Sequence, residues 1–319
     1  MQIPKFDFDK EISNICKHID ELLKTTEIFD DRKATTHLRK TSHVKSIRSS
    51  LAIEGNELSE LQIRDTIRGK TVEGPFDEVV EAKNAVKAYE LIPRIDVFSV
   101  DCFLETEAVM MWGLTEYEGF RTGQVVITDG EKIYYRPPAA EEVPAMMDEL
   151  FNWCSQSGHP AYIVAAVAHY YIESIHPFPD GNGRMGRLWH NAMLVRCSKV
   201  FRMASIENAI RDRQQEYYDV LERCQNAGDC TEFLKFMLNL TVTVLENLRA
   251  LLNPYVFSLL SAMSDTPMTT SDILRKMKMS DRGNLQKRYL KPAIDSGFVA
   301  MTEPDHPHSP TQMYVKLIH

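Results

Sequence analysis

Residues 173–190 read ESIHPFPDGNGRMGRLWH and follow an apolar run, AYIVAAVAHYY, from Ala161 to Tyr171. The apolar run predicts a buried helix over residues 160–175, and a second helix is expected to start near Arg184. Between the two helices lies a loop from His176 to Gly183. The chain has 14 glycines, and three of them fall within this stretch. Such a concentration of Gly between charged residues indicates a candidate site in a helical fold.

The loop has the composition of an anion-binding turn. A loop that leads into a helix N-terminus presents unpaired backbone N–H groups and the positive end of the helix dipole, which together bind phosphate. Gly181 and Gly183 lack a Cβ, so the backbone can approach an anion closely, and Asn182 adds a side-chain donor. Arg184 and Arg187 lie three apart on one face of the helix, where they can bind the distal phosphates of a nucleotide.

Two further residues of the loop suggest catalysis. Asp180 offers a hard oxygen ligand suited to Mg²⁺. His176 is a candidate general base for a hydroxyl nucleophile. Taken singly, a His is usually structural, a Gly-Asn-Gly is usually a turn, and two Arg residues are usually a solvated face. Their combination favours a nucleotide site.

The whole chain has the composition of a soluble globular protein. It has 319 residues, 44% hydrophobic and 26% charged, and its net charge of −8 argues against nucleic-acid binding by the chain as a whole. The six cysteines are scattered without a C-x-x-C pair, which indicates free thiols in a reducing compartment. The N-terminal residues do not resemble a signal peptide, and the apolar run is too short to cross a bilayer. We therefore expect a cytoplasmic protein without a membrane partner.

Most of the chain is predicted to be helical, because Gly and Pro are few and apolar residues recur three and four apart. Ser59 with Gln62 fits a capping box, and Gly55 fits a helix end. Val125 to Arg136 differs, since its alternating pattern around Asp129-Gly130 predicts a β-hairpin. The expected helices before residue 253 are 8–25, 35–54, 59–68, 77–92, 99–113, 141–157, 160–175, 184–197, 210–226 and 230–252.

The chain changes character after Asn253-Pro254. Residues 1–253 carry a net charge of −10, and residues 254–319 carry +2. Expected helices at 255–264, 269–277 and 280–297, followed by strand-like segments at 298–302 and 311–317, give the order of a winged helix. Such a domain can contact DNA through a basic helix or serve as a protein-interaction module, and both alternatives stay open. The basic residues around its second and third helices are Arg275, Lys276, Lys278, Arg282, Lys287, Arg288 and Lys291.

The motif HPFPDGNGRMGR, His176 to Arg187, matches the signature H-P-F-x-[D/E]-G-N-G-R-x-x-R at every specified position, and the chain resembles Fic proteins over about Phe120 to Asp229. The resemblance implies transfer of AMP from ATP to a Ser, Thr or Tyr hydroxyl of an unidentified target protein, or of the protein itself. His176 would deprotonate the hydroxyl, and Asp180 would hold Mg²⁺ on the α and β phosphates. The nucleotide would be bound by Gly181, Asn182, Gly183, Arg184 and Arg187.

The same resemblance assigns further roles. Phe178 would anchor the loop in the core, and Asn226 falls near the place where the family reads adenine. In Doc-type kinases of this superfamily a lysine replaces Gly183 and the γ-phosphate is transferred, so this glycine favours nucleotidyl transfer. The hairpin resembles the family's flap, whose exposed edge pairs with an extended target segment. The flap residues would be Ile127, Thr128, Ile133, Tyr134 and Tyr135.

A second motif lies upstream, in SSLAIEGNELSE from residue 49 to 60. The i, i+4 spacing puts Ser50 and Glu54 on one helix face, and Gly55 ends that helix. An amphipathic helix with a C-cap would show the same pattern. The segment also resembles the inhibitory motif [S/T]-x-x-x-E-[G/N] of self-inhibited Fic proteins, which implies that Glu54 pairs with Arg187 and blocks the γ-phosphate of ATP. A further hypothesis is that Glu54 positions a water for removal of AMP from a modified target.

We therefore predict an all-α protein: an N-terminal helical region with an inhibitory helix (1–95), a Fic-type helical core with a β-hairpin flap (96–252), and a small C-terminal winged-helix domain (253–319). The predicted function is Mg²⁺-dependent AMP transfer, repressed at rest. The alternative is a DNA-binding regulator that uses the winged helix, with the Fic core as a nucleotide sensor. A homodimer is a further candidate assembly.

Overall fold

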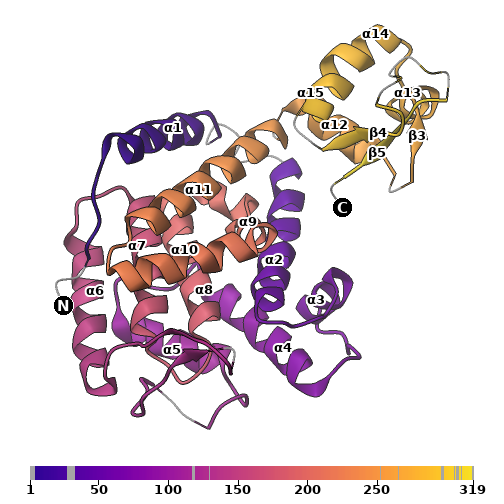
Figure 1. Cartoon of the computed structure of the whole chain (residues 1–319). Helices are drawn as coiled ribbons and strands as arrows, with labels where there is room; N and C mark the ends of the chain where they lie inside the picture. Colours follow the sequence, from indigo (N-terminus) through magenta and orange to yellow (C-terminus); the bar gives the residue numbers. More distant parts are fainter. Residues whose placement is uncertain are drawn as a thin grey trace.

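The computed structural model describes residues 4–26, 33–116, 119–128, 130–251, 253–264, 266–295, 298–304, 306, 309 and 311–317, with only the backbone for 33–37. Three places where elements were expected lie outside the described residues. They are Asp129 in the hairpin turn, Leu252 at the end of the helix expected over 230–252, and residues 296–297 at the end of the helix expected over 280–297. The described chain is mostly helical, as predicted (Figure 1).

The centre of the fold is the helix pair that flanks the glycine-rich loop. These are α7 (Ala161–Ile175) and α8 (Asn182–Cys197). Every residue of α7 from Tyr162 to Ile175 is buried, as expected for a helix that is apolar on all sides. Around the pair pack α1 (Lys10–Thr26), α5 (Val100–Met110), η2 (Ala140–Glu142), α6 (Val143–Gln156) and α11 (Thr231–Leu251).

The N-terminal region contributes a long helix that reaches the loop. This helix is α2 (Lys33–Ile53), followed by α3 (Glu60–Ile67) and α4 (Phe76–Leu91). The predicted capping box of Ser59 and Gln62 is present, and Gly55 follows α2 with φ +91°, a conformation that favours glycine. One hydrophobic core extends from Ile12 to Leu248 and includes side chains of α2, α4 and α8. The domain boundaries at residues 95 and 252 stay predictions.

The helix expected over 210–226 is two helices in the structure. They are α9 (Ile206–Asp212) and α10 (Gln214–Ala227), with η3 (Lys199–Met203) before them. The break falls at Arg213, whose φ and ψ are −125° and 35°. Its guanidinium binds Glu216 (2.6 and 2.8 Å) and lies over the ring of Phe236. The contact with Phe236 is tertiary, and neither Gly nor Pro marks position 213 in the sequence, so the local pattern did not predict the break.

The predicted hairpin is present and short. β1 (Ile127–Thr128) pairs antiparallel with β2 (Ile133–Tyr135), and the register changes between the two residues of β1. β2 lies beside α10, and Lys132 in the turn pairs with Glu222 of α10 at 2.8 Å. The hairpin is therefore attached to the helical core at one side.

The C-terminal elements, coloured yellow at the end of α11 in Figure 1, have a hydrophobic core of their own that extends from Val256 to Tyr314. The sheet is antiparallel with the order β3-β5-β4. The helix expected over 280–297 is interrupted by a π-helical turn, η4, and the two-residue β3 was too short to be predicted. The elements are α12 (Pro254–Ala262), β3 (Met268–Thr269), α13 (Thr270–Met277), α14 (Arg282–Asn284), η4 (Leu285–Leu290), α15 (Lys291–Asp295), β4 (Val299–Met301) and β5 (Met313–Lys316).

The six cysteines are free thiols, four of them buried. Over the part of the chain that the structure describes, the length and hydropathy needed to cross a membrane are not found in any helix.

Candidate nucleotide site

His176 lies at the C-terminal end of α7 in the left-handed conformation, with φ 52° and ψ 60°. Residues other than glycine seldom adopt this conformation, and it costs free energy that the surroundings must offset. The ring is held by its Nδ1, which lies 3.4 Å from the carbonyl oxygen of Glu173. Within the described residues Nε2 has no hydrogen-bond partner. This nitrogen is therefore available to accept a proton.

The electrostatics around His176 favour the neutral ring. Burial of the imidazole is the main cause that lowers its pKa, and the positive charge of Arg121 lowers it further. The carboxylates of Glu173 and Asp180 act in the opposite direction but do not outweigh burial. A neutral imidazole is the form that a general base requires.

The loop after His176 is anchored by an aromatic side chain and an amide. Phe178 is fully buried and its ring lies 5.3 Å from that of Phe103 and 5.9 Å from that of Phe120, which confirms the predicted anchor. Asn182 accepts a hydrogen bond from the N–H of Phe178 and donates one to its carbonyl, both at 2.9 Å. Both polar atoms of the Asn182 side chain therefore hold the loop. Donation to phosphate, by the second amide hydrogen of the side chain or by the backbone N–H, stays a prediction.

The N-terminus of α8 is open for an anion. The helix begins at Asn182, two residues earlier than predicted, and its N-cap Gly181 has φ +83° and no side chain to cap it. This φ favours glycine, and a Cβ on Gly181 would lie 2.5 Å from the Sδ of Met111, so a larger residue would also have to displace that side chain. Because a side-chain cap is lacking, the first N–H groups of α8 can bind an external acceptor.

Arg184, the first arginine of the motif, is held between two carboxylates. It is only 4% exposed, and its terminal nitrogens donate to Glu81 of α4 and to Asp180, both at 2.9 Å. Among the described residues its buried Nε has no partner. Asp180 also accepts from the N–H of Gly181 at 2.6 Å, and its side chain is 66% exposed. An exposed carboxylate at the end of the loop can therefore serve as an oxygen ligand for a cation.

Arg187, the second arginine, is 1% exposed and contacts the upstream motif. Its Nε donates to Ser50 Oγ at 3.2 Å, and one terminal nitrogen donates to Ser50 O at 3.2 Å and to Glu54 Oε1 at 2.5 Å. Burial disfavours the charged guanidinium, but Glu54 and then other nearby groups outweigh burial and raise the pKa of Arg187. A Cβ on Gly183 would lie 2.5 Å from Glu54 Oε1. The structure thus brings together two motifs that are more than 100 residues apart in the sequence.

The remaining predicted residues lie around this centre. Asn226 is exposed in the last turn of α10, one turn after the Glu222 that binds the flap residue Lys132. In the flap, Ile133 is 46% exposed, whereas Tyr134 and Tyr135 are half-buried. Their roles in binding adenine and a target stay predictions.

Sequence reasoning missed three charged residues that shape the site. Arg121 binds the backbone of the loop and Glu81 binds Arg184 of α8. The fully buried Glu207 binds the middle of α2 through Ser46 at 2.7 Å. Each is a single charged residue in an ordinary helical or loop segment, so its role depends on contacts that a local pattern does not encode. His169 and His190, by contrast, are fully buried and contact each other through their Nδ1 atoms at 3.3 Å, away from the loop.

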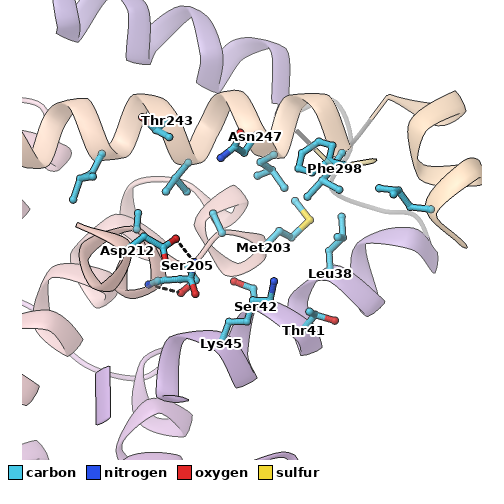
Figure 2. A pocket seen from close by; sticks show the side chains of 18 of the residues that line it. Leu38, Thr41, Ser42, Lys45, Met203, Ser205, Asp212, Thr243, Asn247 and Phe298 are labelled. Carbon is cyan, nitrogen blue, oxygen red and sulfur yellow. Dashed lines mark hydrogen bonds between the residues drawn. The ribbon is translucent and has the colours of Figure 1, made fainter. Parts of the chain in front are cut away.

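A cavity of about 360 Å³ lies away from this loop (Figure 2). It is bordered by the first half of α2, by α9 and α11 and by the C-terminal sheet, with Lys45, Met203 and Phe298 among its lining residues. The residues of the loop do not line it. The cavity is therefore separate from the candidate nucleotide site.

Fold and loop together define a helical protein whose central helix pair places an uncapped helix N-terminus beside a half-buried histidine. Residues 98–194 match the family model described as Fic/DOC family, and residues 254–316 match that of the Filamentation induced by cAMP protein Fic-like, C-terminal domain. A crystal structure of a Fic family protein from Desulfovibrio desulfuricans G20 is 31% identical, with a TM-score of 0.74 and 98% of both chains covered. The chain therefore belongs to the Fic/DOC family.

Named relatives cover part of the chain. Two proteins called protein adenylyltransferase Fic, from Aedes aegypti and Drosophila melanogaster, are 27% and 30% identical over 69% of this chain. The chain spans 44% of the length of each. The structure of Fic-1 from C. elegans is 21% identical to this chain, with a TM-score of 0.59. The match covers 74% of this chain and 71% of the Fic-1 chain, and it supports the fold alone.

Proposed function

We propose that this protein transfers AMP from ATP to a Ser, Thr or Tyr hydroxyl of a target protein, and to itself, and that Glu54 represses this activity. The observation that carries the proposal is the half-buried His176, whose Nε2 has no hydrogen-bond partner among the described residues, at the start of a loop that leads into the uncapped N-terminus of α8. Two buried arginines, Arg184 and Arg187, follow in the first turns of that helix. The relatives named adenylyltransferase support the choice of AMP as the transferred group.

The chemistry assigned to these residues is an in-line displacement. The acceptor oxygen forms a bond to the α-phosphorus while the bond from that phosphorus to the bridging oxygen of the β-phosphate breaks, and pyrophosphate leaves. His176 Nε2 takes the proton of the acceptor hydroxyl. The backbone N–H groups at the start of α8 and the guanidinium groups of Arg184 and Arg187 hold phosphate oxygens and stabilise their negative charge.

The residues present fit a magnesium ion at Asp180. Mg²⁺ in nucleotide sites is usually held by one or two carboxylates together with substrate phosphates and water, and Asp180 is an exposed carboxylate at the end of the phosphate loop. In the described chain, three or more His, Cys, Asp or Glu side chains do not gather into a protein-only metal site. The ion would supply positive charge against the phosphates.

Repression is assigned to the pair of Glu54 and Arg187. While Glu54 holds Arg187, the guanidinium of Arg187 cannot bind the γ-phosphate of ATP, and the negative carboxylate of Glu54 repels that phosphate. An ATP molecule bound without this contact would have its α-phosphorus out of line with the acceptor. The close approach of Glu54 to the backbone of Gly183 supports this reading, because a larger residue at position 183 would displace the carboxylate.

The proposal is tested by labelling with ATP that carries its label in the α-phosphate. We expect Glu54→Gly to raise self-labelling strongly above the wild type, because it frees Arg187, and Glu54→Gly/His176→Ala to label at the background level. Glu57→Gly, which removes an exposed glutamate three residues away, is the matched control and should behave like the wild type. A folded Glu54→Gly protein that labels no better than the wild type would refute the repression.

Removal of AMP from a modified target is a second activity that this geometry allows. Glu54 would orient a water whose oxygen attacks the phosphorus of the protein-bound AMP, so that the P–O bond to the protein breaks and free AMP leaves. Loss of label from a protein already modified by the Glu54→Gly variant tests this. Wild type should remove the label, whereas Glu54→Gly should not.

The finer parts of the prediction follow the same proposal. We assign Asn226 to the adenine ring and the flap residues to a target segment added as a strand. Three helical segments and an antiparallel sheet support the winged-helix interpretation of residues 254–316, and interaction with a protein is the role that we favour for it. The cytoplasm is the proposed location.

A further inference from the structure

Arg121 is a buried arginine that immediately precedes the flap segment. It is 3% exposed. Its Nε donates to the carbonyl of His176 at 2.8 Å, and its terminal nitrogens donate to those of Gly123 (3.0 Å), Pro138 (2.6 Å) and Ile175 (3.3 Å). Its own backbone N–H donates to the carbonyl of the residue after His176 at 2.8 Å. One side chain thus binds four backbone carbonyls.

The hydrogen-bond partners of Arg121 differ from those that a buried arginine usually has. Buried charges are normally paired with an opposite charge, but no ion pair of Arg121 is found among the described residues. Carbonyl oxygens provide the negative partial charge instead, and those of Ile175 and His176 lie at the negative end of the α7 dipole. The rigid fork of five N–H donors suits several acceptors at once, which a lysine cannot match.

The four carbonyls belong to three parts of the site. Gly123 and Pro138 bracket the hairpin, one before β1 and one after β2, whereas Ile175 and His176 end α7. We propose that Arg121 is a positioning residue that fixes both ends of the flap to the backbone of His176, and so sets where a hydroxyl held by the flap meets Nε2. This inference rests on the proposed transfer reaction and on the proposed docking of targets at the flap.

The placement affects the reaction more than nucleotide binding. Transfer depends on near-attack geometry, and a misplacement of about 1 Å can cost two orders of magnitude in rate. Arg121 binds backbone at the acceptor side, whereas Arg184 and Arg187 bind Glu81, Asp180, Ser50 and Glu54. Loss of the Arg121 contacts should therefore change the rate of transfer and leave the interaction with ATP intact.

The experiment uses the full chain in the Glu54→Gly background, with Arg121→Lys and Arg121→Gln as the variants. Lys132→Ala is the control, because Lys132 ties the flap to Glu222 of α10 and does not touch His176. The rate of self-labelling is measured over a range of ATP concentrations, which separates the maximal rate from KM for ATP. Hydrogen exchange of residues 123–138 is measured on the same proteins.

We expect both Arg121 variants to lose roughly tenfold or more in maximal rate, with KM for ATP unchanged and with faster exchange confined to residues 123–138. Lys132→Ala should loosen the flap and lose less rate. An unchanged maximal rate, or unchanged exchange of the flap, would overturn the proposal. A rise in KM for ATP together with faster exchange in α8 would also overturn it, since that result belongs to a general loss of structure.

The pH profile supplies a readout that a purely structural role would not move. The charged groups that face His176 are Glu173 from α7, Asp180 from the loop and Arg121 from the flap side. Arg121→Gln removes the positive charge that lowers the pKa of His176, whereas Arg121→Lys keeps that charge. The acid limb of the labelling profile should therefore lie at higher pH in Arg121→Gln than in Arg121→Lys. If the Glu54→Gly protein does not label at all, the proposed function fails, whereas the exchange measurement still decides whether Arg121 fixes the flap.

Discussion

At the scale of single residues, His176 combines an uncommon backbone conformation with a pKa that burial lowers from its ordinary value of 6.5. The base works only when neutral, and a lowered pKa keeps it neutral until the pH falls through that lower value. We expect the acid limb of AMP transfer by Glu54→Gly to have its midpoint below pH 6.5. Labelling rates at saturating ATP across the acidic range measure it. A midpoint at or above the ordinary histidine value would contradict a ring that its surroundings keep neutral.

The buried pair of His169 and His190 makes stability depend on pH. Burial lowers the pKa of both, that of His169 to about 3. Below the ordinary value of 6.5, the unfolded chain therefore binds protons that the folded chain excludes. We expect the free energy of unfolding to fall with decreasing pH, by up to about 1.4 kcal/mol per pH unit for each histidine. Urea unfolding at several pH values measures the slope of the free energy of unfolding against pH, and His190→Gln should reduce this slope. A free energy of unfolding in the wild type that does not change below pH 7 would contradict the prediction, because it would show that the pair is already charged.

At the scale of elements, hydrogen bonds hold α2 both in its middle and beyond its end. In its middle, Ser46 donates to the buried Glu207, which also accepts from Tyr89 of α4 and Asn191 of α8. Beyond its end, Asn56 donates to Glu81 at 2.9 Å and to the carbonyl of residue 78 at 3.1 Å. Because Glu81 also binds Arg184, the segment that carries Glu54 is connected to both arginines of the motif.

This second contact gives a prediction for a residue outside the motifs. Asn56→Ala leaves Glu54 and Arg187 intact but removes the two side-chain hydrogen bonds of Asn56 to α4. We expect self-labelling above the wild type and below Glu54→Gly, because the carboxylate remains present and is held less firmly. Asn152→Ala, at an exposed position on α6, is the control. Labelling at the wild-type level by a folded Asn56→Ala protein would show that the other contacts of α2 hold Glu54 in place without Asn56.

The elements that were predictable are those whose signal is local. The capping box at Ser59, the glycine that ends α2 and the apolar α7 each follow from a few neighbouring residues, and all three are present. The break at Arg213 and the short β3 depend on contacts with distant side chains or strands. The same holds for the residues of the site. The loop could be predicted from its motif, whereas Arg121 and Glu81 could not, because they come from other elements of the chain.

At the scale of the whole molecule, the site is assembled on one core. Side chains of the N-terminal region and of the motif helices pack in the same hydrophobic cluster. A movement of Glu54 away from Arg187 that is limited to the end of α2 would leave the contact of its middle with Glu207 intact. A displacement limited to this end costs less free energy than one that opens the core.

The C-terminal elements have a separate core and a weakly basic surface, which bears on the alternative of a DNA-binding regulator. Their net charge is only +2. Arg275 pairs with Asp272 at 2.8 Å, and Arg288 binds Tyr255 at 3.2 Å, so two of the basic side chains are already engaged.

We expect the full chain to bind a short DNA duplex only in the non-specific range, with Kd roughly 10⁻⁴ to 10⁻⁶ M, and to lose this binding as salt rises. Fluorescence anisotropy at low and physiological salt, with Lys287→Glu as the control for a backbone contact, measures both. Tighter, sequence-dependent binding that persists in salt, together with a Glu54→Gly protein that transfers no AMP, would instead favour a regulator whose Fic core senses nucleotide.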